Sequence, residues 1–516
     1  MLAITAILMA CVTIPYVFAE RSAGDGFVFG GFLLNPLDGN SYLAKMGLGW
    51  RGDWLFSLPY TAEKGQGALL FFPYILLGHL ARNLGMSLIF TFHAVRVISA
   101  GVMSLAIYRL LTAYLPPGNA PRLATLIASF GSGLGWLMLP FGTFTSDFWV
   151  AEAYPFLSAY ANPHFPLSLA LLIFLLMPVA PMDKGRKWGI AGAEHPLYPI
   201  LGVILASLAL ALLSPFAVVI VLVIWSALAM WEIIQSYYLS QPIELSGMLS
   251  RLGWIALGGL PVLVYDLVVI SSDPLLSAWN AQNLTPTTPP WDVLASLSPV
   301  LLLLPFGVQG VLSEGGRPRR LLVVWVIVCL ALLYIPWGLQ RRFMMGIYVP
   351  ISALAATGVA RLAGDGRRFW FWGAILFVLV LPTNLLVNLA ALHGMQTHDE
   401  RLYLTRDESA ALAWIEANTQ PDAIILASPE MGMFIPAQTG RRVVYGHPFE
   451  TVRAEEQKSL VEGFLRGDTV SNSQAMLDRI DYVFYGPRER AIGQNSLLAS
   501  LRVVYQNPSV VVYSAR

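Results

Sequence analysis

Apolar runs close to the thickness of a lipid bilayer dominate this sequence and leave few folds open to it. A transmembrane helix needs about 20 mostly apolar residues. Eleven runs come near that length, at 1–20, 90–114, 122–141, 163–181, 198–213, 215–235, 252–271, 293–312, 321–338, 343–361 and 369–391. The stretch 197–234 is divided at Ser214-Pro215, because one helix of that length would measure ~57 Å against ~30 Å of hydrocarbon. The pattern predicts a mainly α-helical, polytopic transmembrane bundle of about eleven spans.

Composition excludes several other classes of protein. Charged residues make up 12% of the 516 residues and hydrophobic residues 56%, whereas a soluble domain carries about 25% charged residues. That deficit excludes a disordered chain and argues against a soluble globular enzyme. The formal net charge of +1 gives no electrostatic basis for binding nucleic acid. Cys11 and Cys329 both lie in apolar runs, so we expect neither a disulfide framework nor a zinc site.

Basic residues indicate the orientation of the spans. Lys and Arg gather in cytoplasmic loops. A cytoplasmic N-terminus puts five basic groups inside: Arg122; Lys184, Arg186 and Lys187; Arg251; Arg317, Arg319 and Arg320; and Arg361, Arg367 and Arg368. The run 67–85 is interrupted by Pro73, His79 and Arg82. If it were a span, all five basic groups would lie outside the cytoplasm, so we predict an interfacial helix there. Met1–Ala19 is expected to be an uncleaved anchor, because it has no basic n-region.

The expected orientation puts the loops 21–66, 142–162 and 272–291 outside the cytoplasm, together with the chain after about residue 392. Charged residues become dense after Gly394, and strand-like and helical patterns alternate. We expect strands at Ala423–Ala427, Arg442–Tyr445, Tyr482–Tyr485 and Val503–Tyr513, and helices at Glu408–Asn418 and Ala454–Leu465. The sequence thus predicts a membrane domain at 1–394, whose first extracytoplasmic loop (21–89) carries interfacial helices, and a small extracytoplasmic α/β domain at 395–516.

The first outside loop contains the leading catalytic candidate, Asp38, in the segment Asp38-Gly39-Asn40. This loop is longer than a connection needs to be and places carboxylates among many aromatic residues. At the start of an expected interfacial helix, Asp38 is suited to deprotonate a hydroxyl as a general base. The alternative is that Asp38 only caps that helix. We expect Asn40, Tyr60 and Glu63 of the same loop to contact the substrate.

The second outside loop adds two carboxylates, Asp147 and Glu152, and His164 follows at the mouth of a span. With Asp38, these carboxylates suit a divalent cation, Mg²⁺ or Mn²⁺, which prefers hard oxygen ligands. The alternative is ordinary solvated loop charge. His164 is a candidate substrate contact, because ionisable groups at membrane depth are usually paired or functional; the alternative is a structural hydrogen-bonding histidine.

An arginine pair lies in the segment Gln340-Arg341-Arg342-Phe343, and the same orientation puts it outside, against the positive-inside trend. Two guanidinium groups can bind a phosphate bidentately. We therefore predict that Arg341 and Arg342, with Gln340, bind the phosphate of a donor; binding to lipid headgroups is the alternative. His447, in the turn His447-Pro448-Phe449-Glu450, is a candidate acceptor contact. Arg96 lies in a span and needs a partner that the sequence does not identify.

These features resemble the GT-C class of integral-membrane glycosyltransferases, which contains the protein mannosyltransferases, the aminoarabinose transferases and the oligosaccharyltransferases. The resemblance covers the membrane part by architecture. By motif it rests on the first loop, with its Asp-Gly-Asn-Ser-Tyr-Leu-Ala-Lys-Met and Pro-Tyr-Thr-Ala-Glu stretches, and on Gln340-Arg341-Arg342-Phe343. Bacterial members of the class look most similar, so the resemblance implies a multi-pass protein of the bacterial plasma membrane.

The resemblance also implies roles for individual residues. In this class an aspartate of the first outside loop is the catalytic base or helps to hold a metal, and that role falls on Asp38. Acidic residues of the second outside loop assist in some branches, here Asp147 and Glu152. A basic residue near a late span contacts the lipid phosphate, which points to Arg341 and Arg342. The Asp-Glu pair of the mannosyltransferases is absent, and this departure leaves the sugar and the acceptor open.

The implied reaction moves a sugar from a polyprenyl-phosphate donor to a lipid, glycan or protein acceptor. Asp38 would activate the acceptor hydroxyl, and the arginines would stabilise the charge that grows on the departing phosphate. Two other classes stay open. Broken spans and the buried Arg96 also fit a transporter or flippase for a lipid-linked or polar solute, although no internal repeat links the halves. A sensor or assembly protein, acting through the C-terminal part, is the third class.

Overall fold

The computed structural model describes residues 1–177, 197–240, 245–314, 319–468 and 470–516. Lys184, Arg186, Lys187 and Arg317, on which the predicted orientation partly depends, lie outside the described residues. The chain forms two compact units. We call them the helical unit, Met1–Thr13, Val95–Tyr265 and Thr285–Leu389, and the mixed unit, Ile14–Ala94, Asp266–Leu284 and Ala390–Arg516.

Among the described residues, five helices are long and apolar enough to cross a membrane: α1 (Leu2–Ser22), α4 (Leu88–Tyr114), α9 (Pro215–Leu239), α10 (Ser246–Ser272) and the stretch Arg367–Gln396, in which α16 (Arg367–Val380) is followed by α17 (Pro382–Gln396). Counting one bent helix pair as a span gives six. Shorter apolar helices are α7 (His164–Leu176), Ile200–Leu213 within α8 (Leu197–Leu213), α14 (Arg320–Leu333) and α15 (Tyr348–Ala363). The chain is a mainly helical, multi-pass membrane protein. The count of eleven spans stays a prediction.

Two predicted spans differ from the helices that form. The span at 122–141 is wrong beyond Phe130, where α5 (Ala120–Phe130) ends, because the glycine-rich segment after it turns its backbone N–H groups toward Asp147. The run 293–312 is divided between α12 (Pro290–Leu297) and α13 (Leu304–Glu314), at a bend of 82° in this part of the chain.

Two other local predictions concern breaks and short helices. The break at Ser214-Pro215 is confirmed, since α8 ends at Leu213 and α9 starts with Pro215 at its first position, where the missing N–H of proline costs nothing. The run 67–85 forms the 13-residue helix α3 (Phe72–Leu84). Its place in the membrane interface stays a prediction.

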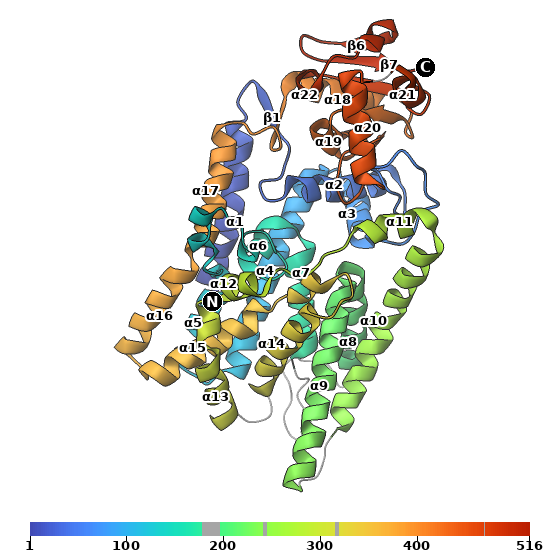
Figure 1. Cartoon of the computed structure of the whole chain (residues 1–516). Helices are drawn as coiled ribbons and strands as arrows, with labels where there is room; N and C mark the ends of the chain where they lie inside the picture. The colour runs from blue at the N-terminus through green and yellow to red at the C-terminus, as the bar shows by residue number, and fades with distance from the viewer. Residues whose placement is uncertain (178–196, 241–244, 315–318, 469) are drawn as a thin grey trace. The chain divides into compact units, whose positions relative to one another are not determined.

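Small residues allow the helices of the helical unit to pack closely. Helix α15 packs against α5 and α13, and eleven of its sixteen residues are buried. A Cβ atom on Gly307 of α13 would lie 2.0 Å from the carbonyl oxygen of Leu354 in α15, so only glycine fits there. Helices α8 and α9 run side by side (Figure 1), and α7 contacts both. The short helix α6 (Pro155–Ala161) precedes α7 and packs against it.

The mixed unit is built on a five-stranded sheet with the order β4-β3-β5-β7-β6, and its strands β6 and β7 are labelled in Figure 1. Its strands are β3 (Ile424–Leu426), β4 (Arg442–Val443), β5 (Tyr482–Tyr485), β6 (Arg502–Gln506) and β7 (Val511–Ser514). Strands β4, β3 and β5 are parallel, whereas β7 and β6 are antiparallel neighbours. The predicted strand Val503–Tyr513 is therefore wrong as a single strand, because the chain reverses at Asn507-Pro508-Ser509 and forms a hairpin. A separate ladder joins β1 (Phe27–Phe29) to β2 (Tyr403–Thr405).

Helices cover both faces of this sheet. Ile425 and Phe484 point to the face that is covered by α18 (Arg406–Asn418), α19 (Pro429–Thr439) and α2 (Pro36–Arg51). Leu426 and Val483 point to the opposite face, under α20 (Ala454–Arg466) and α21 (Val470–Leu477), as the period of two residues in a strand requires. The remaining helices of the unit are α11 (Pro274–Gln282) and α22 (Pro487–Ile492). Because α2 shares this core, the division at residue 394 into independent domains stays a prediction.

Helices α2 and α3 cross at two glycines. A Cβ atom on Gly49 would lie 1.9 Å from the carbonyl oxygen of Ile75, and one on Gly78 would lie 1.9 Å from that of Met46. Backbone therefore meets backbone on both sides of the crossing, and any side chain would force the helices apart. This crossing fixes where α2 lies along α3 and how α2 is rotated about its own axis. Helix α2 is the one that carries Asp38.

We predict that Gly78→Ala lowers the thermal unfolding midpoint of the purified protein in detergent. The added methyl group overpacks the crossing, which costs about 1–3 kcal/mol of unfolding free energy. Gly253→Ala in α10 is the control, because a Cβ atom there meets nothing within 4 Å and alanine favours helix over glycine. Equal midpoints for the two variants would contradict the proposed crossing.

Candidate functional site

Asp38 lies in the first turn of α2, in the mixed unit. The helix begins at Pro36, and Asn35 occupies the capping position in a left-handed conformation with φ 50°. The alternative that Asp38 caps the helix is therefore wrong. A carboxylate in the first turn still interacts favourably with the helix dipole. Its Oδ2 accepts a hydrogen bond of 2.5 Å from Asn35 Nδ2, and 39% of the side chain is exposed to solvent.

His447 faces Asp38 from the turn between β4 and α20. Its Nδ1 accepts hydrogen bonds from the backbone N–H groups of Phe449 (3.0 Å) and Glu450 (3.2 Å). The other ring nitrogen, Nε2, lies 3.5 Å from Asp38 Oδ1. The imidazole is almost fully buried. The structure thus brings together two of the predicted site residues, a half-exposed carboxylate and a buried imidazole.

A buried ion pair connects the same turn to α2. Lys45 Nζ lies 2.7 Å from Glu450 Oε1 and 2.6 Å from Ser41 Oγ, and Ser41 Oγ donates to Glu450 Oε1 at 3.2 Å. The ammonium group also lies 4.2 Å from the ring centre of Phe71, a favourable cation–π distance. Side chains spaced by three and four residues share one helix face, so Asp38, Ser41 and Lys45 present a single polar face to the turn.

The other predicted contacts of the first loop have structural partners. Asn40 is buried and donates to the Pro36 carbonyl at 2.9 Å, while its Oδ1 has no hydrogen-bond partner among the described residues. Tyr60 is buried, donates to the Met433 carbonyl at 3.0 Å, and its ring centre lies 5.7 Å from that of His447. Burial raises the pKa of the Tyr60 phenol well above its usual value. Glu63 pairs with Arg453. The contact of these residues with substrate stays a prediction.

Asp147, in the helical unit, is surrounded by four donors. Its Oδ2 accepts from the backbone N–H groups of Gly133 and Gly135, both at 3.1 Å, and from Thr383 Oγ1 at 2.9 Å, while Oδ1 accepts from Thr145 Oγ1 at 2.6 Å. Burial raises the pKa of Asp147, and the hydrogen bonds from Thr145, Thr383 and Gly135 act in the opposite direction. The side chain has no exposed surface. These contacts favour a structural role and leave a direct role in catalysis as a prediction.

The arginine pair is held by residues of the predicted second loop, also within the helical unit. Arg342 Nη1 lies 3.2 Å from Glu152 Oε1, a buried carboxylate. Arg341 lies over Trp149, with its guanidinium carbon 4.5 Å from the ring centre. Both arginines belong to the 3₁₀ helix η6 (Gln340–Met344). The structure therefore brings together predicted phosphate-binding and acidic residues.

Two further predicted residues, Gln340 and His164, belong to the helical unit as well. The Gln340 side-chain oxygen is buried, with no hydrogen-bond partner among the described residues. His164 starts α7 and packs against Phe165, with ring centres 4.0 Å apart. Their roles in binding the donor or the substrate stay predictions.

The predicted metal site finds little support in the contacts of its carboxylates. In neither unit do three His, Cys, Asp or Glu side chains of the described residues gather closely enough to hold a metal ion. Both oxygens of Asp147 already accept hydrogen bonds, and one oxygen of Glu152 pairs with Arg342. These two carboxylates are thus poor metal ligands in the arrangement described, and the divalent cation stays a prediction.

Buried arginines of the helical unit bind backbone carbonyl groups. Arg96 Nη1 donates to Val12 (2.9 Å) and Ala159 (2.7 Å), which supplies the partners that the sequence did not identify. Arg251, one of the predicted cytoplasmic residues, donates to the Phe174 and Leu175 carbonyls near the end of α7. Arg96 thus has the contacts of a structural residue, which removes one observation behind the transporter alternative.

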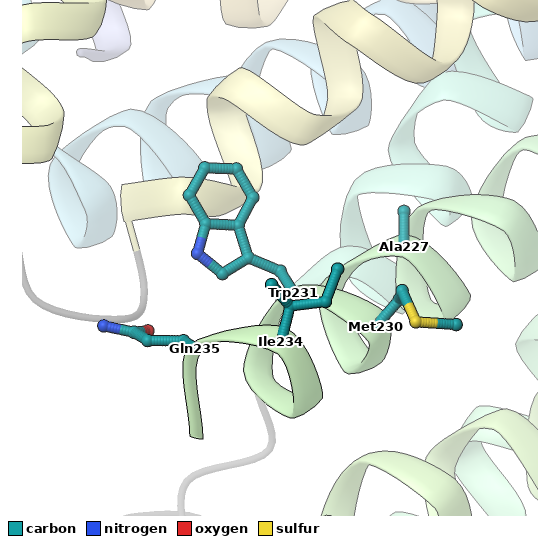
Figure 2. Close-up of a pocket in the computed structure, with 5 residues that line it drawn as sticks. All are labelled: Ala227, Met230, Trp231, Ile234 and Gln235. Atoms are coloured by element: carbon teal, nitrogen blue, oxygen red, sulfur yellow. The ribbon is translucent and has the colours of Figure 1, made fainter. Parts of the chain in front are cut away.

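A pocket of about 490 Å³ lies along α9 (Figure 2). Among the described residues, its lining comes from α9: Ala227, Met230, Trp231, Ile234 and Gln235. Arg320 donates to Gln235 and to Glu232 next to this lining. None of the predicted site residues lines the pocket, so it adds nothing to the candidate site.

Comparison with known proteins identifies the fold. No protein-family model and no curated protein matches the sequence, but solved structures do. The Archaeoglobus fulgidus oligosaccharyltransferase, tethered to an acceptor peptide with an NVT sequon, matches with a TM-score of 0.50 and 14% identity over 100% of this chain and 74% of that one. Its apo form gives 0.51 and 13%, over 94% and 69%. The chain has the fold of the GT-C glycosyltransferases.

The resemblance stated from the sequence is thereby confirmed at the level of the fold. ArnT from Cupriavidus metallidurans, bound to undecaprenyl phosphate, has a TM-score of 0.49 and 11% identity over 99% of this chain and 98% of that one. At sequence identities this low, the similarity of the folds assigns no role to any individual residue. The roles of Asp38, Arg341 and the other candidates in this GT-C-like chain therefore depend on its own contacts.

Sequence reasoning missed two sets of residues in this GT-C-like chain. Ser41, Lys45 and Glu450 form the buried polar contact beside Asp38. The spacing of Asp38, Ser41 and Lys45 was a readable signal for one helix face, whereas nothing local pointed to Glu450. The segment Gly131–Gly135 wraps the Asp147 carboxylate, and its three glycines in five residues were a readable signal for a helix end.

We predict that Asp147→Asn keeps the fold and Asp147→Ala does not. An asparagine can accept from Gly133 and Gly135 through its oxygen and donate to the Thr145 hydroxyl through its amide, whereas alanine leaves buried donors without an acceptor at about 1–3 kcal/mol each. The thermal unfolding midpoint in detergent measures this difference. Transfer activity distinguishes a structural from a catalytic role of Asp147. If the role is structural, the Asn variant should be active. An Asn variant that is stable but inactive would assign Asp147 to catalysis.

Proposed function

We propose that this protein is a membrane glycosyltransferase, which moves a sugar from a polyprenyl-phosphate-linked donor to an acceptor hydroxyl outside the cytoplasm. The observation that carries the proposal is the half-exposed Asp38 carboxylate, held by Asn35 and faced by His447, in a chain with the GT-C fold. The acceptor is a lipid, a glycan or a protein. The oligosaccharyltransferase with the same fold has an acceptor peptide tethered to it, which supports an acceptor of substantial size.

Asp38 is proposed as the general base. An exposed carboxylate can accept the proton of an acceptor hydroxyl, while the remaining donors keep its orientation. The acceptor oxygen forms a bond to the anomeric carbon as the bond from that carbon to the phosphate oxygen breaks. The proton passes to Asp38, and the polyprenyl phosphate leaves with the bonding electrons. Each atom and charge is thereby accounted for without another reactant.

Arg341 and Arg342 are proposed to bind the phosphate of the donor. With Glu152, these three charged side chains sum to +1, which matches the single negative charge of a sugar linked through one phosphate. A diphosphate-linked donor would bring at least one more negative charge. When the sugar leaves, the phosphate gains charge, and the guanidinium groups stabilise it more strongly than they stabilise the donor.

Asp38→Asn is expected to slow the release of free polyprenyl phosphate strongly. The amide cannot accept the acceptor proton, and loss of a general base typically lowers the rate about 100- to 10,000-fold. Wild type and variant are reconstituted in liposomes with a panel of radiolabelled polyprenyl-phosphate sugars and a mixture of candidate acceptors. Asp53→Asn, an exposed carboxylate after the same helix, is the control and should keep full activity. Full turnover by Asp38→Asn would refute the proposed base.

Arg341→Ala is expected to weaken catalysis by about 10- to 100-fold in kcat/KM for the donor, the cost of losing a charged hydrogen bond to phosphate. Arg367→Ala, at the start of α16, is the control and should leave kcat/KM unchanged. Free polyprenyl phosphate should inhibit the Arg341→Ala variant less strongly than it inhibits the wild type or Arg367→Ala. An unchanged inhibition constant would show that Arg341 does not hold the donor phosphate.

A further inference from the structure

The tautomer of His447 follows from its backbone contacts. Nδ1 accepts two backbone N–H groups, from Phe449 and Glu450, so no proton can occupy that nitrogen without breaking both bonds. A neutral imidazole has one N–H, which must therefore be on Nε2. This nitrogen is buried, forms no hydrogen bond among the described residues, and lies 3.5 Å from Asp38 Oδ1.

We propose that His447 is a positioning residue, whose Nε2–H donates to Asp38 and orients the carboxylate for proton abstraction. The inference rests on the proposed function, in which Asp38 is the base. The distance of 3.5 Å is slightly longer than an ordinary N–H···O hydrogen bond, and rotation of the half-exposed carboxylate closes it. Catalytic hydrogen bonds often tighten only when substrate is bound.

The polar contacts around His447 keep it in place. Glu450, three residues along the same turn, is tied to α2 by Lys45 and Ser41, and Lys45 lies on the helix face that carries Asp38. The Thr451 hydroxyl accepts the His447 backbone N–H at 3.3 Å. The turn 447–450 is thus tied to α2 at Ser41 and Lys45, and it faces Asp38 of the same helix. The ring of Tyr60 packs near the imidazole and covers one side of it with an uncharged group.

This arrangement assigns a task to the C-terminal part of the chain. The turn 447–450 lies more than 400 residues after Asp38, yet it supplies the donor for the proposed base. Such a donor holds Oδ1 in place while Asn35 holds Oδ2, and the second lone pair of an oxygen held in this way is presented to the acceptor hydroxyl. A neutral donor orients the base without the full charge neutralisation that a cation would bring, so the carboxylate keeps its basicity.

Two substitutions divide the functions of the imidazole. His447→Asn keeps an acceptor for the backbone N–H groups of Phe449 and Glu450, as in an Asx turn, but loses the donor to Asp38. His447→Gln places an amide N–H near the position of Nε2 but loses the short-range acceptor. The positioning role predicts that kcat falls in the order wild type, Gln, Asn, while the unfolding midpoint falls in the order wild type, Asn, Gln.

The expected loss of kcat in His447→Asn is about 3- to 10-fold, the value of one hydrogen bond, with KM for the acceptor nearly unchanged. In the Asp38→Asn background the same substitution should lower the residual rate no further. A kcat order that follows the unfolding midpoint, or a raised acceptor KM at constant kcat, would overturn the inference in favour of a structural or a substrate-binding role.

Nitrogen NMR of ¹⁵N-histidine-labelled protein tests the geometry without turnover. The signal that disappears in His447→Asn belongs to His447, and at neutral pH it should show a protonated Nε2 and an unprotonated Nδ1. A protonated Nδ1 would overturn the inference even if transfer occurs. Absence of transfer in the wild type would instead contradict the proposed function, and the NMR result would still decide the tautomer.

Discussion

A charge that is taken out of water must be given partners, and this requirement shapes both units of the chain. Arg96 reaches backbone carbonyl groups, Asp147 collects four donors, and Lys45 pairs with Glu450. In each case at least one partner comes from a segment that is distant in the sequence but belongs to the same unit. The charge therefore specifies which segments meet, because removing a partner leaves an uncompensated ion in a medium of low polarity.

Helix α2 shows how this requirement prepares a site. One side of the helix crosses α3 at Gly49 and Gly78 with backbone in contact, which leaves little freedom to slide or rotate. Another side carries Asp38, Ser41 and Lys45 toward the turn 447–450. A base on a helix that is fixed in this way is positioned more accurately than one on a free loop. On this polar face Ser41 and Lys45 are buried, whereas 39% of the Asp38 side chain is exposed, so Asp38 is the carboxylate that solvent or a substrate can reach.

Local patterns predicted much of the fold. The break at Ser214-Pro215 and the β3, β4 and β5 segments were readable, because apolar periodicity and proline act over a few residues. The errors also had local causes. Apolar residues predict a helix past Phe130 although glycines follow it, and one strand over Val503–Tyr513 although Asn507-Pro508-Ser509 is a turn sequence. In both segments the apolar residues continue past the breaker, but the breaker decides where the element ends.

The candidate site was predicted as separate residues and understood only through its contacts. The sequence by itself determined that the chain enters a membrane many times, and it singled out Asp38, His447 and the arginine pair by residue type and place. Only the tertiary structure decided that His447 faces Asp38, that Glu450 holds Lys45 across 405 residues, and that Glu152 pairs with Arg342. The physical reason is that hydrophobic patterning is a local property of a chain, whereas the partner of a buried charge is chosen by packing between distant segments.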